Sequence, residues 1–167
     1  MTSPRANAPA TPEDLRRLRE AVDRSAAARA DGRHPFAATV VAADGRPLAE
    51  AANRSTGPDG DPTQHAELLA VASAARAVGP EGMRGSTLYT SAEPCAMCAG
   101  AAYWTGIDRV VYALSESRLL ELTGSHPENP TLDLPCREVF ARGQREVAVS
   151  GPHLEDEAAR AHAGFWS

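Results

Sequence analysis

The amino-acid sequence predicts a single α/β domain, organised as a three-layer α/β/α sandwich around a mixed five-stranded sheet. After an initial hairpin pattern, short apolar runs typical of strands alternate with periodic segments typical of helices. The chain has 167 residues, which is the size of one ordinary domain. No internal repeat is found, so a repeat architecture is not expected.

Local signals define each expected element. Thr11 has the identity of a helix N-cap and Pro12 suits the first helical position. The dipeptide Asp44-Gly45 predicts a hairpin turn. In chain order we expect a helix over 12–30, strands over 36–42 and 48–53, a helix over 62–77, a loop over 79–85, a strand over 87–91, a helix over 95–104, a strand over 109–114, a loop-like stretch over 115–135 with one helical turn near Leu119, a helix over 134–142, a strand over 146–150 and a helix over 155–163.

The two ends of the chain are expected to differ from the domain between them. Residues 1–10 are rich in Pro, Ala, Ser and Thr without periodicity, and we interpret them as a mobile tail. The single domain then covers 11–167. Within it, 152–167 would form a C-terminal helix and tail.

Composition excludes several classes of protein. All 17 basic residues are arginine, and the absence of lysine excludes Schiff-base enzymes and P-loop nucleotidases. A net charge of −5 argues against a protein whose main task is to bind nucleic acid, because that binding depends on cationic surfaces. No apolar run reaches membrane-spanning length, so no membrane segment is expected. Three cysteines, two of them at C-x-x-C spacing, favour a cytoplasmic protein that uses thiols for metal or redox chemistry.

Two short segments carry the chemistry: His65-Ala66-Glu67 and, after 26 intervening residues, Pro94-Cys95-Ala96-Met97-Cys98. Each opens a predicted helix, and side chains in a first helical turn lean toward the N-terminus, so one imidazole and two thiolates can converge. Three protein ligands leave tetrahedral Zn²⁺ one position for water, whose pKa the metal lowers from 15.7 toward ~7. Glu67 is placed to move the water's proton to a substrate. The pattern predicts hydrolytic removal of an amine from an electron-poor ring carbon.

Other interpretations of these residues stay open. A structural zinc site could be closed by a fourth ligand such as Cys136 or His126, although this would leave Glu67 without a role. A non-catalytic, zinc-stabilised binding module is a related possibility. A thioredoxin-like dithiol is disfavoured by Pro94 and by the upstream His-x-Glu.

The motifs resemble those of the cytidine deaminase superfamily, in the branch that contains bacterial guanine deaminases and tRNA adenosine deaminases. The resemblance extends over about Leu15–Val149, and it is carried by the two segments, by Glu93 to Ala101 and by Asn53-Arg54. It implies one zinc ion per subunit and a homodimer. It also implies the following roles: His65, Cys95 and Cys98 as zinc ligands, Glu67 as proton shuttle, Asn53 as a hydrogen-bond partner of the substrate base, and the backbone at Ala66 as a further contact.

The few aromatic residues favour guanine or guanosine as the substrate. Tyr103-Trp104, after the second cysteine, is similar to an aromatic pair of guanine deaminases, and Phe36 matches a pocket-wall aromatic there. In that family a C-terminal aromatic residue of the partner subunit can cap the active site, which implies the same for Phe165 and Trp166. From this resemblance we predict substrate contacts from Phe36, Trp104, Phe165 and Trp166. Each of these four residues could instead pack within the protein without contacting a substrate.

A tRNA adenosine deaminase is the alternative function, and the acidic run Glu155-Asp156-Glu157 argues against it. Guanine deaminases use an acidic residue to bind one edge of the base, for which Glu116 and Glu128 are candidates. His126 would recognise a different face of the ring, so cytosine-type and triazine-type bases stay open. The expected partner is a small base or nucleoside, with neither a membrane nor a nucleic acid.

Overall fold

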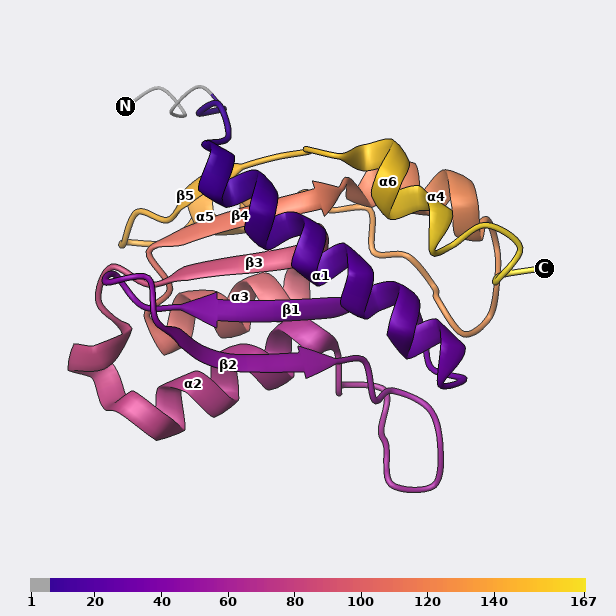
Figure 1. Ribbon diagram of the computed structural model, residues 1–167, viewed down its shortest axis with the longest axis horizontal. Helices are drawn as coiled ribbons and strands as arrows, with labels where there is room; N and C mark the ends of the chain where they lie inside the picture. The colour runs from indigo at the N-terminus through magenta and orange to yellow at the C-terminus, as the bar shows by residue number, and fades with distance from the viewer. Residues whose placement is uncertain (1–6) are drawn as a thin grey trace.

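A computed structural model of the chain describes residues 7–167 and confirms the α/β/α architecture (Figure 1). The five strands lie in the order β2-β1-β3-β4-β5. β1 is antiparallel to β2 and to β3, whereas β3 with β4 and β4 with β5 are parallel, so the sheet is mixed as predicted. The strands are β1 (Ala37–Val41), β2 (Pro47–Ala52), β3 (Thr87–Ala92), β4 (Arg109–Leu114) and β5 (Ala148–Ser150).

Helices cover both faces of this sheet. The helices are α1 (Pro12–Ala30), α2 (Ala66–Met83), α3 (Ala96–Thr105), α4 (Glu116–Thr123), α5 (Cys136–Ala141) and α6 (Glu155–Arg160). One apolar core joins α1, α4 and α6 to the sheet, and a second joins α2, α3 and α5 to its other face. Figure 1 shows α1 crossing the near face while α2 and α3 lie beyond the strands. Two cores on opposite sides of one sheet make the three layers.

Helix α1 is fixed at its start, as the sequence predicts. Thr11 and Asp14 form a reciprocal capping box, and Asp14 also accepts hydrogen bonds from the Tyr89 hydroxyl and the Arg109 guanidinium. Burial alone would raise the pKa of Asp14, but the hydrogen bonds from Arg109, Thr11 and Tyr89 hold it below its usual range. This carboxylate therefore ties α1 to β3 and β4.

Three expected boundaries are wrong for identifiable reasons. Helix α2 begins at Ala66 and not at residue 62, because the Asp61 side chain accepts hydrogen bonds from Thr63 and holds a turn there. The helix then continues to Met83 across a kink at Gly79, whose φ of 66° is readily adopted only by glycine. The single turn expected near Leu119 is the complete helix α4, capped by Ser115. The strand predicted over 109–114 is β4 itself, and smaller differences of one to three residues occur at the ends of β1, β2, β3, β5, α3, α5 and α6.

The chain ends also differ in part from expectation. Asn7 accepts hydrogen bonds from Arg137 and Gly151, and the Ala8 carbonyl accepts one from Ser150. These two residues of the expected mobile tail are therefore attached to the domain, while residues 1–6 of that prediction lie outside the described part of the chain. Within residues 7–167, no helix is both long enough and apolar enough to cross a bilayer.

Candidate active site

The predicted site residues come together where two helices begin. His65 is the N-cap of α2 and Cys95 is the N-cap of α3, and both have extended backbone conformations. Neither side chain caps its own helix, so both stay available for another partner. Cys95 follows the carboxyl end of β3 by three residues, at the edge where parallel strands of α/β proteins place their ligands.

His65, Cys95 and Cys98 form a cluster that fits a zinc ion, called the zinc-ligand cluster below. Their ligand atoms lie within 4.8 Å of one another, and His65 Nδ1 is 3.6 Å from Cys95 Sγ. Hydrogen bonds from the Cys98 thiol and from His65 lower the pKa of Cys95 to about 4, which favours the thiolate form. The same interaction with Cys95 raises the pKa of His65. One imidazole and two thiols are the donor set of zinc sites, and three of them leave one coordination position open.

Among the described residues, the cluster has no fourth ligand atom within the same distance. Within residues 7–167 neither Cys136 nor His126 joins the group of ligand atoms. The Cys136 thiol is buried at the start of α5, where burial raises its pKa, and the His126 ring lies 5.4 Å from that of Trp166. The structure therefore disfavours the closed structural zinc site that the sequence left open.

Glu67 lies beside the zinc-ligand cluster in the first turn of α2. It is 5% exposed, and its Oε2 is 3.9 Å from Cys98 Sγ. Burial raises the pKa of Glu67 to about 7. A carboxyl group with this pKa both accepts and releases a proton near neutral pH, which is the property that a proton shuttle needs.

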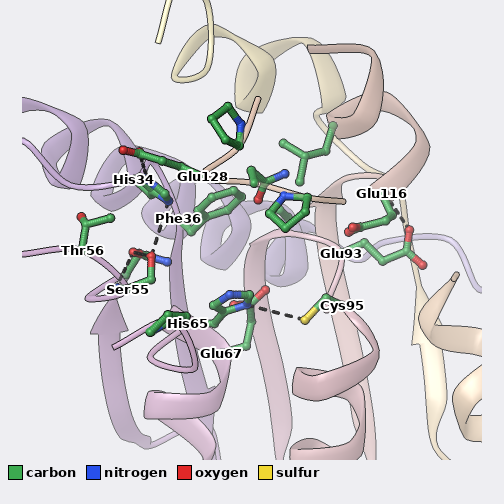
Figure 2. A pocket seen from close by; sticks show the side chains of 17 residues that line it. His34, Phe36, Ser55, Thr56, His65, Glu67, Glu93, Cys95, Glu116 and Glu128 are labelled. Carbon is green, nitrogen blue, oxygen red and sulfur yellow. Dashed lines mark hydrogen bonds and ion pairs between the residues drawn. The ribbon is translucent and has the colours of Figure 1, made fainter. Parts of the chain in front are cut away.

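A cavity of about 330 Å³ opens in front of the cluster (Figure 2). Its deep end is formed by His65, Glu67 and Cys95, together with Asn53 and Glu116, which are 2% and 5% exposed. Its mouth is formed by Ser55, Thr56 and the segment 127–130, which are more exposed, together with the buried His34. A substrate that reaches the zinc-ligand cluster must enter past this mouth.

Asn53 and Phe36 both line the cavity, as predicted. The Oδ1 atom of Asn53 accepts hydrogen bonds from the backbone N–H and the hydroxyl of Ser55, at 2.9 and 2.7 Å. The Nδ2 group has no hydrogen-bond partner among the described residues, so it is the donor left for a ligand. The Phe36 ring supplies an apolar wall on which a planar ring can pack.

Glu93 is a site residue whose role the sequence analysis did not identify. It is buried two residues before Cys95, and its two oxygens accept hydrogen bonds from the backbone N–H groups of Glu116 and Cys136, each at 2.9 Å. One carboxylate thereby holds the first residues of α4 and α5 against the loop that bears Cys95. A glutamate next to a Pro-Cys pair is the only sequence signal, and it does not reveal these distant partners.

The predicted aromatic contacts are only partly brought together. Trp104 is 85% exposed and does not line the cavity, because α3 turns Cys98, Ala99 and Ala102 inward and Trp104 away from them. Phe165 and Trp166 also do not line it. Trp166 is buried behind the wall, with ring centroids 4.9 Å from His34 and 6.2 Å from Phe36 of the same chain. In this chain the tail therefore packs on the wall of its own pocket.

Two further predictions have mixed outcomes. The side chain of Ala66 is part of the apolar core, so only its backbone can contact a ligand. Glu116 and Glu128 both line the cavity, Glu116 at the deep end and Glu128 at the mouth, whereas His126 does not. Burial, reinforced by Cys95 and the neighbouring carboxylates, raises the pKa of Glu116 to about 8.

Comparison with known proteins places these features in a family. Residues 12–114 match the family model described as the cytidine and deoxycytidylate deaminase zinc-binding region. A Schizosaccharomyces pombe protein named "Probable cytosine deaminase" is 42% identical over 154 residues, covering 92% of this chain and 93% of the relative. A tRNA-specific adenosine deaminase of Agrobacterium fabrum is 38% identical over 79 residues, covering 47% of this chain and 51% of that protein.

A solved structure shows the same fold. The guanine deaminase from Nitrosomonas europaea has a TM-score of 0.73 to this chain at 28% identity, covering 98% of this chain and 88% of that one. The names of these relatives refer to cytosine, adenosine and guanine. Both motifs of this chain lie inside the matched family region.

Proposed function

Because the chain belongs to the cytidine and deoxycytidylate deaminase family, we propose that this zinc-dependent hydrolytic deaminase acts on a free nucleobase or a nucleoside. The observation that carries the proposal is the cavity itself. Its deep end combines the zinc-ligand cluster with the buried Glu67, and arginine is absent from its lining among the described residues.

The chain's own groups can perform the proton transfers of such a reaction. Hydrolysis converts the ring amine and water into a ring carbonyl and ammonia, so protons must move from the water to a ring nitrogen and to the leaving amine. Glu67 accepts a proton from water and returns it to the ring, since its pKa of about 7 suits both steps. His65, Cys95 and Cys98 would hold the zinc ion, which would supply the reaction with a water of lowered pKa.

The deep end of the cavity suits a ring that carries a carbonyl group. Asn53 Nδ2 is a free donor for a ring carbonyl oxygen, which guanine and cytosine have and adenine lacks. Guanine or guanosine is our first candidate. A cavity of about 330 Å³ has room for a bicyclic ring, and the Glu116 carboxyl lines it where it can pair with a ring N–H.

Cytosine or cytidine is the second candidate. It is favoured by the S. pombe relative, whose printed name is that of a cytosine deaminase and whose similarity covers nearly the whole chain. Asn53 Nδ2 would donate the same hydrogen bond to the carbonyl oxygen of cytosine. A tRNA substrate is disfavoured, because the chain carries a net charge of −5 and polyanions are bound by cationic surfaces.

We further propose a homodimer and a cytoplasmic location. Trp104 is exposed beside the apolar stretch of α3, as expected for a residue that a second subunit covers. The three cysteines are free thiols, which suits a reducing compartment.

A substrate panel tests the proposed function. We expect the zinc-loaded protein to release ammonia from guanine, guanosine, cytosine or cytidine, and not from an anticodon stem-loop of tRNA. The measurement is coupled detection of ammonia. Silence across the panel, with zinc content confirmed at one ion per chain, would rule the proposal out.

A further inference from the structure

Residues 124–130 form a loop between α4 and α5 whose two ends lie close together. The side-chain oxygens of Thr123 and Thr131, which flank the loop, are 3.3 Å apart. Gly124 begins the loop with φ 53° and ψ −128°, a backbone conformation that glycine adopts readily and other residues do not. A loop with its ends together and a glycine at its base can turn about that base while the flanking helices stay in place.

The loop is held together by its own hydrogen bonds. The His126 N–H donates to the Thr123 carbonyl, and the Asn129 N–H donates to the His126 carbonyl. The His126 Nδ1 atom accepts a hydrogen bond from the Glu128 N–H, and the Asn129 side chain donates to Thr131. These bonds join only residues of the loop and its base, so they can persist while the loop moves as one body.

One side-chain pair connects the loop to the rest of the domain. Glu128 Oε2 lies 2.8 Å from His34 Nε2. In the described part of the chain, residues 125–130 have no other hydrogen bond or ion pair to a residue outside 123–131. The remaining long-range contact is between the rings of His126 and Trp166, whose centroids are 5.4 Å apart. The position of the loop therefore depends on few interactions.

The two members of this pair differ in their freedom to move. His34 is buried, and its ring packs edge-to-face against the rings of Phe165 and Trp166, at 5.7 and 4.9 Å. The Glu128 side chain is 57% exposed. The hydrogen bond with His34 lowers the pKa of Glu128, so the bonded carboxyl group is ionised at neutral pH. His34 is thus the fixed partner, and Glu128 is the one that can leave.

The closed position of the loop covers the entrance to the pocket. Residues 127–130 line the cavity at its mouth. Figure 2 shows Glu128 meeting His34 on the side of the pocket away from Cys95 and Glu116. The hydrogen bond between Glu128 and His34 therefore holds the loop over the route by which a ligand reaches the deep end.

We propose that residues 124–130 are a lid, hinged at Gly124 and held closed by the hydrogen bond between Glu128 and His34. The lid opens to admit a ligand to the pocket and closes over it. Closure excludes bulk water from the deep end, where Glu67 and the zinc-ligand cluster lie. The lid controls access to the pocket whichever ring the pocket binds.

Capture of zinc by a chelator measures the opening of the lid without any turnover. The zinc-loaded protein is mixed with an excess of a chromogenic pyridylazo chelator, and the absorbance of the zinc complex gives the rate of capture. A hydrogen bond to a charged group changes an equilibrium by about tenfold or more, so Glu128→Ala should raise the open population and the rate by about that factor. Glu81→Ala, which truncates an exposed carboxylate on α2 outside the pocket, should keep the wild-type rate. Equal rates for the two variants would overturn the proposal.

The variant Gly124→Ala tests the hinge without changing Glu128 or His34. No atom lies within 4 Å of the added Cβ, so the substitution acts through the backbone conformation alone. Alanine is strained at this positive φ, and we expect the rate of zinc capture to rise about fivefold or more. Gly45→Ala is the matched control, because Gly45 also has a positive φ and open space around it but lies in the turn between β1 and β2. A rate for Gly124→Ala equal to that of Gly45→Ala would contradict the hinge.

Urea distinguishes opening of the lid from unfolding of the domain. Opening the lid exposes little surface, so the rate of zinc capture should change by less than about twofold between zero and about 1 M urea, in the wild type and in both lid variants. Capture through global unfolding would instead rise about tenfold or more over the same range. A steep rise confined to Glu128→Ala and Gly124→Ala would show that they act on overall stability, and would refute the lid.

Discussion

At the scale of single residues, the site depends on carboxyl groups placed in different environments. Glu67 is buried beside the zinc-ligand cluster and has its pKa raised to about 7, whereas the equally buried Glu93 is occupied by two backbone N–H groups. Glu67 is thus available for the proposed proton transfer, whereas both carboxylate oxygens of Glu93 are occupied by hydrogen bonds. The sequence predicted the first because His-x-Glu is a local pattern. It missed the second because the partners of Glu93 lie 23 and 43 residues away.

The variant Glu93→Gln should destabilise the protein and weaken zinc binding. Its amide keeps one acceptor oxygen but turns an NH₂ group toward the other backbone N–H, which loses its partner. We expect a loss of about 1–3 kcal/mol in the free energy of unfolding, measured by denaturant titration of the zinc-loaded protein. Glu121→Gln, an exposed carboxylate on α4, is the control and should stay within about 0.5 kcal/mol. Equal stability of the two variants would contradict the role given to Glu93.

At the scale of elements, the C-terminal tail acts as a support for the pocket wall. Trp166 packs on His34 and Phe36 of the wall and on His126 of the segment that precedes the mouth. Arg29 of α1 donates to the carbonyls of Ala161 and Ala163, so the tail is fixed to its own chain. The sequence predicted an aromatic tail near the site. The burial of the tail depends on rings from three distant segments, which no periodicity indicates.

The docking of this tail should depend on pH through His162. Burial, with Arg29 and His34 nearby, lowers the pKa of His162 to about 4, and its Nδ1 accepts a hydrogen bond from Trp166 Nε1. The unfolded state, with a usual histidine pKa near 6.5, therefore binds more protons between about pH 4 and 6.5. The stabilising effect of neutral His162 is thus complete above about pH 6.5 and is lost as the pH falls toward 4.

Thermal unfolding of the wild type and of His162→Gln at pH 7.5, 6.5 and 5.5 measures this dependence. We expect the advantage of the wild type to shrink by roughly 1 kcal/mol for each pH unit below 6.5. Since zinc release and other histidines affect both proteins alike, the difference between them isolates His162. A difference that does not change with pH would refute the assignment.

At the scale of the whole molecule, one sheet with two cores holds the N-termini of α2 and α3 at the same edge. The sequence predicted this architecture, because alternating strands and helices leave few ways to bury both faces of a sheet. It also predicted the zinc ligands, which lie in short segments at helix starts. Trp104 was predicted in the pocket from its proximity to Cys98, but the rotation of α3 points it outward, where it is 85% exposed.

Removal of zinc should lower the stability of the entire domain. The ion would join α2 to α3 through His65, Cys95 and Cys98, and the unfolded chain does not hold these ligands together. At a free zinc concentration 100 times Kd, binding to the folded state contributes about 2.7 kcal/mol. A chelator-treated sample should therefore unfold at a lower temperature and recover with added zinc. An unchanged unfolding temperature would show that this cluster does not bind the metal.

The most direct test of the account is ammonia release by zinc-loaded Glu67→Gln, compared with the wild type on the best nucleoside or base of the panel. Metal content is measured on the same samples. We predict one zinc ion per chain in both proteins and a fall in kcat of about 100- to 10,000-fold in the variant, as expected when a general acid–base group is removed. Retention of zinc together with near wild-type turnover would contradict the role of Glu67 and, with it, the proposed mechanism.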